Sequence, residues 1–468
     1  MEVNHVVVLM IDDLGAEQFF ELLSANMLPN IKKHFHNSIF SRNMICTYPS
    51  ITIPSQHAIL TGYYPDKTFI PMMSWFDRKK NIYRDYSVGS NVFRQNEDLS
   101  KEIKTVYERV DGNRVSMHIG LRRGANYSSP PEWVVKLRFL TKFMPRDSFM
   151  KTTGILAKNF TKPFEEPKRY FENAEPPSLA VGLFFASDAA LHMYGSNSEK
   201  YLKVLRDIDG AIGKIIDKMK SLGYGEDTAF IICTDHGNFT AERILDINEV
   251  LVKKGLKPYN FKKRKGDFFA INGVQANIHL HGDDWFERPT LEDMRDYNGK
   301  DMVELSLNLP GVERVFCRDG KKVVVESKEG FAEIVHKDNK TKYKVEGRDP
   351  LGYEDLKIAD GKYHDIDEWL KYTYNINFPL VADNIWRYLE TERSPDMLLG
   401  TDWKTCYTNH RYNHGIGSKS CMSCPLMISV PDGTKKEIPY AKVADVAATI
   451  LQFFGKKPEK DMASKPIN

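Results

Sequence analysis

Short apolar runs alternate along this chain with longer segments in which apolar residues recur every three or four positions. The runs at residues 6–11, 179–185, 229–233 and 425–430 are apolar on both faces. Such runs are typical of central strands in a mostly parallel sheet that is covered on both sides. Between residues 201 and 219, apolar side chains fall on one stripe, as in an amphipathic helix packed on a sheet. The pattern predicts the α/β class, with the sheet between helical layers.

The pattern changes between residues 241 and 399, where the apolar runs become shorter. Asp319-Gly320 separates apolar segments at residues 315–318 and 323–325, and this dipeptide is typical of a tight hairpin turn. Short runs at residues 332–335 and 343–345 predict further antiparallel strands. We therefore expect a core of residues 1–240 and 400–468, with a closing helix at residues 443–454, and an inserted α+β cap of residues 241–399.

The composition is that of an ordinary globular protein. Of the 468 residues, 41% are hydrophobic and 28% are charged, so the whole chain is expected to fold. The 66 Lys and Arg residues nearly balance the 63 Asp and Glu residues, which gives a net charge of +3. This balance gives no electrostatic argument for a nucleic-acid polymer or a membrane as partner. The oligomeric state stays open.

The amino-terminal segment and the cysteines indicate which cellular compartment to expect for the protein. The segment before the first strand lacks the basic start of a signal peptide, and no apolar stretch approaches the roughly 18 residues needed to cross a bilayer. Six cysteines spread over a long chain are by default reduced thiols, so we expect a cytoplasmic protein. Cys421 and Cys424 could ligate zinc together with Cys406, but a fourth ligand is not evident, and their role stays open.

Candidate chemistry falls where the predicted strands end. In open α/β sheets, ligands bind outside the carboxyl ends of the strands. Three aspartates and three histidines lie at or near the ends of the predicted strands: Asp12, Asp188, His192, Asp235, His236 and His414. Mixed carboxylate and imidazole ligands suit Zn²⁺, and two such ions can polarise one bridging phosphoryl oxygen.

Thr52 is the candidate nucleophile. Pro54 suits the first turn of a helix and Gly62 suits its end, so Thr52 is predicted just before the amino end of a short helix. The free N–H groups at such an end stabilise an oxyanion, and a metal-bound hydroxyl can become an alkoxide. Taken alone, a Thr at this position is more often a helix cap, and an Asp after a strand is more often a turn residue.

Three nearby residues have a structural interpretation beside the chemical one. His57 is interpreted first as packing on a helix face, although it could line the pocket. His410 would replace His414 as a ligand if the segment were helical, whereas the glycines that follow His414 favour His414. Asp13 is predicted to be a turn residue that points away from the metal, because neighbouring side chains of an extended chain point to opposite sides.

The order of these residues resembles the alkaline phosphatase superfamily, and in particular its type I phosphodiesterase and nucleotide pyrophosphatase branch. The matching segments span nearly the whole chain: residues 11–12, 48–54, 60–65, 187–188, 192–195, 234–237 and 414–415. Weaker likeness extends to residues 74–77, residues 246–251 and the closing helix. The resemblance implies an alkaline-phosphatase-like core.

The resemblance also implies a ligand set and an activity. One divalent ion would be surrounded by Asp12, Thr52, Asp235 and His236, and the second by Asp188, His192 and His414. Zn²⁺ is expected and Mn²⁺ is possible. The implied activity is hydrolysis of small phosphodiester or pyrophosphate-type substrates, nucleotides among them, through a phosphothreonine intermediate. The alternatives are phosphonate or phosphomonoester hydrolysis or phosphoryl transfer on the same scaffold, and, outside enzymes, a metal-binding relative without activity.

The chain departs from the family on the substrate side. Pyrophosphatase-type members carry Asn three residues after the nucleophile, where this chain has Ser55. The contact to a non-bridging phosphate oxygen is therefore in question. Trp75 and Phe76, like Tyr63 and Tyr64, lie close in sequence to the nucleophile and could stack a nucleobase. They could equally belong to the core.

Overall fold

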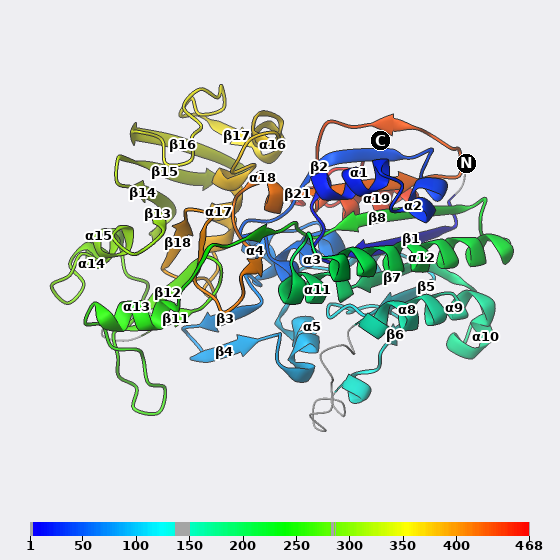
Figure 1. Ribbon diagram of the computed structural model, residues 1–468, viewed down its shortest axis with the longest axis horizontal. Coiled ribbons are helices and arrows are strands. Elements are labelled where there is room, and N and C mark those ends of the chain that lie inside the picture. The colour runs from blue at the N-terminus through cyan, green and yellow to red at the C-terminus, as the bar shows by residue number, and fades with distance from the viewer. Residues whose placement is uncertain (1–2, 136–149, 282–284, 286, 468) are drawn as a thin grey trace.

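The computed structural model describes residues 3–135, 150–281, 285 and 287–467. Within these residues the chain forms two large β-sheets that lie side by side, with helices packed around them (Figure 1). None of the described helices is both long and apolar enough to cross a membrane.

The first sheet consists of β1 (His5–Ile11), β2 (Ile39–Ile45), β5 (Asn113–Met117), β6 (Tyr127–Ser129), β7 (Pro177–Phe184), β8 (Thr228–Thr234), β21 (Ser423–Ser429), β22 (Lys436–Glu437) and β23 (Ala441–Lys442). Its order is β22-β2-β21-β8-β1-β7-β5-β6, and β23 also pairs with β2. Strands β8, β1, β7, β5 and β6 are parallel, which confirms the predicted mostly parallel sheet. Strand β21 is central, as its apolar run predicted, but it runs antiparallel to both neighbours.

Helices cover both faces of the first sheet. Val7 and Leu9 of β1 belong to one hydrophobic cluster, whereas Val6 and Val8 belong to another. The first cluster contains residues of α1 (Ala16–Ser24), α2 (Pro29–His34), α8 (Thr152–Phe160) and α12 (Glu199–Ser221), and the second contains residues of α3 (Thr52–Thr61) and α19 (Asp445–Phe453). Burial on both sides explains why the central strands are apolar throughout.

The second sheet consists of β11 (Phe268–Ile271), β12 (Ala276–Leu280), β13 (Val312–Asp319), β14 (Lys322–Ser327), β15 (Gly330–Lys337), β16 (Lys340–Gly347), β17 (Tyr363–Asp365) and β18 (Met397–Thr401). Its order is β11-β12-β18-β13-β14-β15-β16-β17, and all neighbours are antiparallel. The predicted turn joins β13 to β14, where Gly320 has a φ of 55° that glycine adopts without strain. The boundaries of the cap stay a prediction.

The two sheets share one hydrophobic cluster. Val6 and Val8 of β1 belong to the same group of buried side chains as Val323 and Val325 of β14. Helix α17 (Val381–Leu389) connects the two parts, because it contacts β14, β15 and β16 and also α4 (Pro65–Thr68). The segment that carries the second sheet is therefore packed on the rest of the chain.

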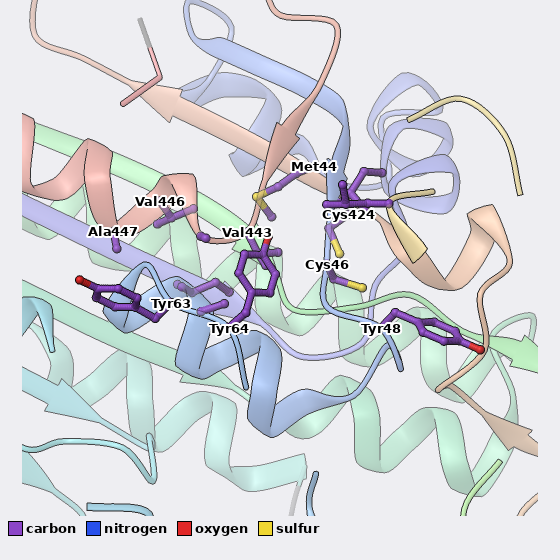
Figure 2. Packing of buried hydrophobic residues seen from close by; sticks show 14 of the residues in the cluster. Met44, Cys46, Tyr48, Tyr63, Tyr64, Cys424, Val443, Val446 and Ala447 are labelled. Atoms are coloured by element: carbon purple, nitrogen blue, oxygen red, sulfur yellow. The ribbon is translucent and has the colours of Figure 1, made fainter. Parts of the chain in front are cut away.

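Figure 2 shows part of this shared cluster. Tyr63 and Tyr64, which follow α3, are each 1% exposed. Of their two sequence interpretations, core packing fits this burial and base stacking does not. Cys46 and Cys424 lie in the same cluster as free thiols.

The remaining elements are short. The helices are η1 (Gly89–Arg94), α5 (Gln95–Asp98), α6 (Val106–Arg109), α9 (Lys162–Glu165), α10 (Pro167–Tyr170), α11 (Ala186–Tyr194), α13 (Ile247–Lys253), α14 (Leu291–Arg295), α15 (Met302–Leu307), α16 (Ile366–Thr373) and α18 (Lys419–Met422). Three pairs of strands complete the fold: β3 (Ser74–Asp77) with β4 (Ile82–Asp85), β9 (Phe239–Thr240) with β20 (Tyr412–Asn413), and β10 (Arg243–Ile244) with β19 (Thr405–Cys406).

Candidate active site

The predicted ligand residues gather at one edge of the first sheet. Asp12 directly follows β1, Asp235 directly follows β8, and Asp188 lies in the first turn of α11, which follows β7. Because β8, β1 and β7 are adjacent and parallel, their carboxyl ends meet at the same edge. His414 reaches this edge from far along the chain because β20 pairs with β9, with Asn413 opposite Phe239.

The first group of candidate ligands lies beside Thr52. The ligand atoms of Asp12, Asp235 and His236 all lie within 4.8 Å of one another, and all three residues are buried. The Thr52 hydroxyl oxygen lies 2.9 Å from His236 Nε2, which is itself 3.6 Å from Asp12 Oδ1. Thr52 is the first residue of α3, and Gly62 ends the helix in the left-handed conformation. The hydroxyl therefore lies at a helix amino end, where N–H groups lack helical acceptors.

The second group adjoins the first. The ligand atoms of Asp188, His192 and His414 also lie within 4.8 Å of one another. The rings of His414 and His236 stack with their centroids 3.8 Å apart, so the two groups are neighbours. Among the described residues, His410 is a member of neither group, although its ring centroid lies 5.3 Å from that of His192. The geometry favours His414 over His410.

Backbone contacts orient all three histidine rings. The Nδ1 atoms of His192, His414 and His236 lie 2.7, 3.0 and 3.2 Å from a backbone carbonyl oxygen. A proton on Nδ1 can be donated to that oxygen, which leaves the lone pair of Nε2 directed at the ligand group. This is the tautomer that a metal ligand of this kind needs.

The arrangement of the buried carboxylates suits the binding of a cation, because without one their like charges would repel each other. Asp12 Oδ1 and Asp188 Oδ1 are buried and have no hydrogen-bond partner among the described residues. Burial, together with the charges of Asp235 and Asp188, raises the pKa of Asp12 well above its usual value. Like charges buried this closely are costly unless a cation neutralises them. The donor set therefore fits divalent ions.

The same carboxylates raise the pKa values of two of the histidines. Burial lowers the pKa of His236, but Asp235 and Asp13 outweigh burial and raise it to about 10. Burial likewise lowers the pKa of His192, but Asp188 raises it to about 9. Metal ions compete with protons for such nitrogens, so any metal bound here would be released in acid.

Sequence reasoning missed two supporting side chains. Gln56 Nε2 donates to Asp235 Oδ2 at 2.8 Å and so orients that carboxylate. Its position one helical turn after Thr52 was the available signal, because residues four apart share a helix face. Ser187 Oγ donates to the backbone oxygen of Asp12 and thereby ties the loop after β1 to the start of α11.

The three predicted substrate residues are buried, and their contact with substrate stays a prediction. Ser55 is 0% exposed, and its hydroxyl lies 2.8 Å from that of Thr47. Trp75 is 2% exposed and lies under the guanidinium of Arg393. Phe76 is 0% exposed and packs with other aromatic rings. These side chains lie close to Thr52 in sequence, but folding directs them into the interior.

His57 and the cysteines have structural surroundings. His57 is 0% exposed, its Nε2 lies 2.9 Å from Gln95 Oε1, and burial lowers its pKa to about 4. This fits the packing interpretation. Cys406 Sγ donates to the backbone oxygen of His410, and no candidate metal group among the described residues contains a cysteine.

Asp13 is a turn residue, as predicted, but it also contacts a candidate ligand. It does lie in a turn, with a left-handed φ of 56°. Its side chain, however, is 0% exposed and approaches His236, with Asp13 Oδ1 3.6 Å from His236 Nδ1. This contact is made to Nδ1, whereas Nε2 of His236 faces Thr52 and Asp12, so the side chain points away from the candidate metal group as predicted.

A cavity of about 170 Å³ lies beside His414. Its walls include Ile51 and Met73 from the amino-terminal part of the chain and Val274 and Gln275 from the part that carries the second sheet. Residues between 241 and 399 therefore border the candidate active site.

A mostly parallel α/β sheet with two adjoining Asp and His groups at its carboxyl edge is the arrangement of a metal-dependent hydrolase. The model of the family described as type I phosphodiesterase / nucleotide pyrophosphatase matches residues 6–420. The chain belongs to this family.

Two relatives illustrate the similarity. The chain is 26% identical over 226 residues to ectonucleotide pyrophosphatase/phosphodiesterase family member 1 of Rattus norvegicus, a match that covers 45% of this chain and 22% of that protein. It is 22% identical over 228 residues to a bis(5'-adenosyl)-triphosphatase of Bos taurus, with 48% of this chain and 46% of that protein covered. The chain thus spans less than half the length of these relatives.

Proposed function

We propose that this chain hydrolyses phosphodiester or pyrophosphate-type bonds, with Thr52 as nucleophile and two divalent ions held by the two ligand groups. One observation carries the proposal: the Thr52 hydroxyl lies at the amino end of α3, 2.9 Å from Nε2 of the candidate ligand His236. Zn²⁺ is the expected ion, because imidazole with carboxylate suits it, and Mn²⁺ is the alternative.

Each of the two ligand groups would hold one ion. The first ion would be held by Asp12, Asp235 and His236 beside Thr52, and the second by Asp188, His192 and His414. Bound there, divalent ions would supply Lewis acidity and neutralise charge on the phosphoryl oxygens.

Thr52 forms the covalent intermediate. Attack by its oxygen makes a new phosphorus–oxygen bond and breaks the bond to the leaving group, which takes up the proton lost by the hydroxyl. Water then attacks the phosphothreonine, the phosphoryl group departs, and a proton returns to Thr52. The N–H groups at the amino end of α3 stabilise negative charge on the phosphoryl oxygens during both steps.

The surroundings of two arginines favour diesters over monoesters. A monoester carries one more negative charge, for which an arginine is a common partner. Arg122 and Arg123 are adjacent in the sequence. Arg122 lies over the ring of Phe93 at 3.8 Å and donates to the backbone of Pro130, and Arg123 pairs with Glu108 at 3.1 Å. Both are thus engaged in structural contacts.

The relatives suggest which substrates to test first. Their names describe pyrophosphatase, phosphodiesterase and bis(5'-adenosyl)-triphosphatase activities, so nucleotides with phosphoanhydride bonds come first. We also propose that residues 241–399 act as a cap that governs substrate choice, because Val274 and Gln275 border the cavity beside His414.

A substrate panel tests the proposal. Protein stripped with a chelator and then given Zn²⁺ or Mn²⁺ is assayed on nitrophenyl phosphodiesters, phosphomonoesters and phosphonates and on bis(5'-adenosyl) triphosphate. We expect metal-dependent turnover that is fastest on the diesters or the triphosphate. Turnover confined to monoesters or phosphonates would select the alternative reactions. Turnover that needs no metal, or no turnover on the whole panel, would contradict the proposal.

A further inference from the structure

Asp13 is a buried carboxyl group that the proposed mechanism does not use. Its side chain is 0% exposed, and neither carboxylate oxygen has a hydrogen-bond partner among the described residues. A buried carboxylate is costly unless something compensates its charge. The contact between Asp13 Oδ1 and His236 Nδ1, at 3.6 Å, indicates what that compensation is.

The two nitrogens of His236 face different neighbours. Nε2 lies 2.9 Å from the Thr52 hydroxyl and 3.6 Å from Asp12 Oδ1. Nδ1 lies 3.2 Å from the backbone oxygen of Gly237 and 3.6 Å from Asp13 Oδ1. Asp13 is therefore on the far side of the ring from the candidate metal group, which excludes it as a fourth ligand of the same ion.

Contacts of the backbone hold Asp13 in this place. Its N–H donates to Asp235 Oδ1 at 3.2 Å, and its carbonyl accepts from the Tyr201 hydroxyl at 3.0 Å. Tyr201 is itself 0% exposed. The turn that carries Asp13 is thus fixed on one side to a candidate ligand and on the other to α12.

We propose that Asp13 is a positioning residue for the metal site: its carboxylate, with the Gly237 carbonyl, keeps the proton of His236 on Nδ1 and Nε2 directed at the ion. The inference rests on the proposed metal-dependent function. At 3.6 Å the contact exceeds hydrogen-bond length, so the carboxylate acts on the Nδ1–H dipole of His236 through its electric field. A carboxylate behind a ligating histidine fixes the ring and makes it a stronger donor.

Asp13→Gly separates this role from that of a turn residue. Glycine adopts a φ of 56° without strain, so a residue needed only for the turn can be replaced with no loss of stability. If Asp13 positions His236, Asp13→Gly weakens the binding of one of the two ions by about 10–100-fold and leaves the other unchanged. Zn²⁺ affinity is measured by competition with a chromophoric chelator, without substrate, beside the unfolding temperature of chelator-treated protein.

Two further variants complete the design. Asp13→Asn keeps the shape and an acceptor oxygen but removes the charge, so we expect an affinity between those of the wild type and Asp13→Gly. It also serves if the glycine variant does not fold. Asn26→Gly is the matched control, because Asn26 has a φ of 57° in an exposed turn, and its replacement should leave both affinities unchanged.

The outcomes separate this inference from the proposed function. If the wild type binds Zn²⁺ at two sites and both Asp13 variants keep both affinities within about threefold, the inference is wrong and the function stands. If the wild type itself binds no metal, the proposed function fails first. The positioning role is supported if both variants bind one ion more weakly and the chelator-treated variants are as stable as the chelator-treated wild type.

Discussion

At the residue scale, Thr52 is buried, yet its hydroxyl faces the polar side chains of the candidate active site. Its side chain is 8% exposed, and its hydroxyl faces His236 rather than the backbone N–H groups that a helix cap would satisfy. Its neighbours in α3 are buried as well. A hydroxyl directed from a buried helix end into a group of carboxylates and imidazoles is placed for reaction.

Substitution of Thr52 tests its proposed role as the nucleophile. We expect Thr52→Ala to lower turnover of the best phosphodiester by at least about a hundredfold, because the attacking oxygen is lost. A mere helix cap would cost only about 0.5–2 kcal/mol of stability. Turnover, metal content and the unfolding temperature are measured together. Thr52→Ser, which keeps a hydroxyl, is the control. An alanine variant that keeps more than about a tenth of wild-type activity would indicate direct attack by water.

His57 predicts a pH dependence of stability. Burial lowers its folded pKa from 6.5 to about 4, so between these values the unfolded chain binds more protons than the folded one. Its stabilising effect is complete above pH 6.5 and is lost as the pH falls toward 4, up to about 3 kcal/mol. We expect His57→Gln to lose less stability than the wild type between pH 7.5 and pH 4.5 in urea titrations. Equal losses in the two proteins would contradict the prediction.

Single residues also mark where prediction from the sequence ended. Five of the six candidate ligands could be found because they follow predicted strands, and His414 could be found because the order of all six resembles that of a known family. Ser55, Trp75 and Phe76 could not be placed, because closeness to Thr52 in sequence does not say which way a side chain points. All three are buried. Asp13 was correctly predicted as a turn residue, but its contact with His236 could not be predicted, because it depends on the left-handed φ of that turn.

At the element scale, the central strands and α12 were predictable because burial on both faces, or on one stripe, leaves a clear apolar pattern. The direction of β21 could not be predicted, because a run of apolar residues looks the same whether the strand is parallel or antiparallel to its neighbours. Its antiparallel pairing depends on the path of the chain through the second sheet and back. The pairing of β9 with β20 is two residues long and left no periodic signal, yet it brings His414 to the site.

Two glycines of α12 offer an element-scale prediction. A Cβ added at Gly210 would meet nothing within 4 Å, so Gly210→Ala should stabilise the protein by about 0.5–1 kcal/mol. A Cβ at Gly213 would collide with the Asn30 side chain, which donates to Asp209 at 2.7 Å and cannot move freely. Gly213→Ala should therefore destabilise by about 1–3 kcal/mol. Thermal unfolding measures both, and shifts of the same sign would contradict the prediction.

At the scale of the whole molecule, the site depends on segments from nearly the full length of the chain. Asp12 and His414 come from opposite ends of the described sequence, and the shared cluster of Val6, Val8, Val323 and Val325 joins the two sheets. Replacing residues 241–399 by a linker would expose this cluster. Substitutions at Val274 or Gln275 are the better test of the cap's role in substrate choice.

The two ligand groups predict the metal content of the molecule. After reconstitution with Zn²⁺ at neutral pH and desalting, native mass spectrometry should find about two ions per chain. Asp12→Asn and Asp188→Asn remove a ligand from different groups, so each variant should retain about one ion. The absence of stoichiometric metal in the wild type would contradict the proposed mechanism. Equal loss of both ions in each variant would show that the groups form one cooperative site.

Strand β21 lies between β2 and β8, although it is synthesised after every other strand of the first sheet except β22 and β23. At about 5–20 residues per second, the ribosome needs roughly 10–40 s to pass from residue 234 to residue 423. During that interval β2 and β8 present open edges, which pair readily with other chains. The nascent chain is thus exposed to aggregation during a large part of its synthesis, and the second ligand group is complete only once His414 has emerged.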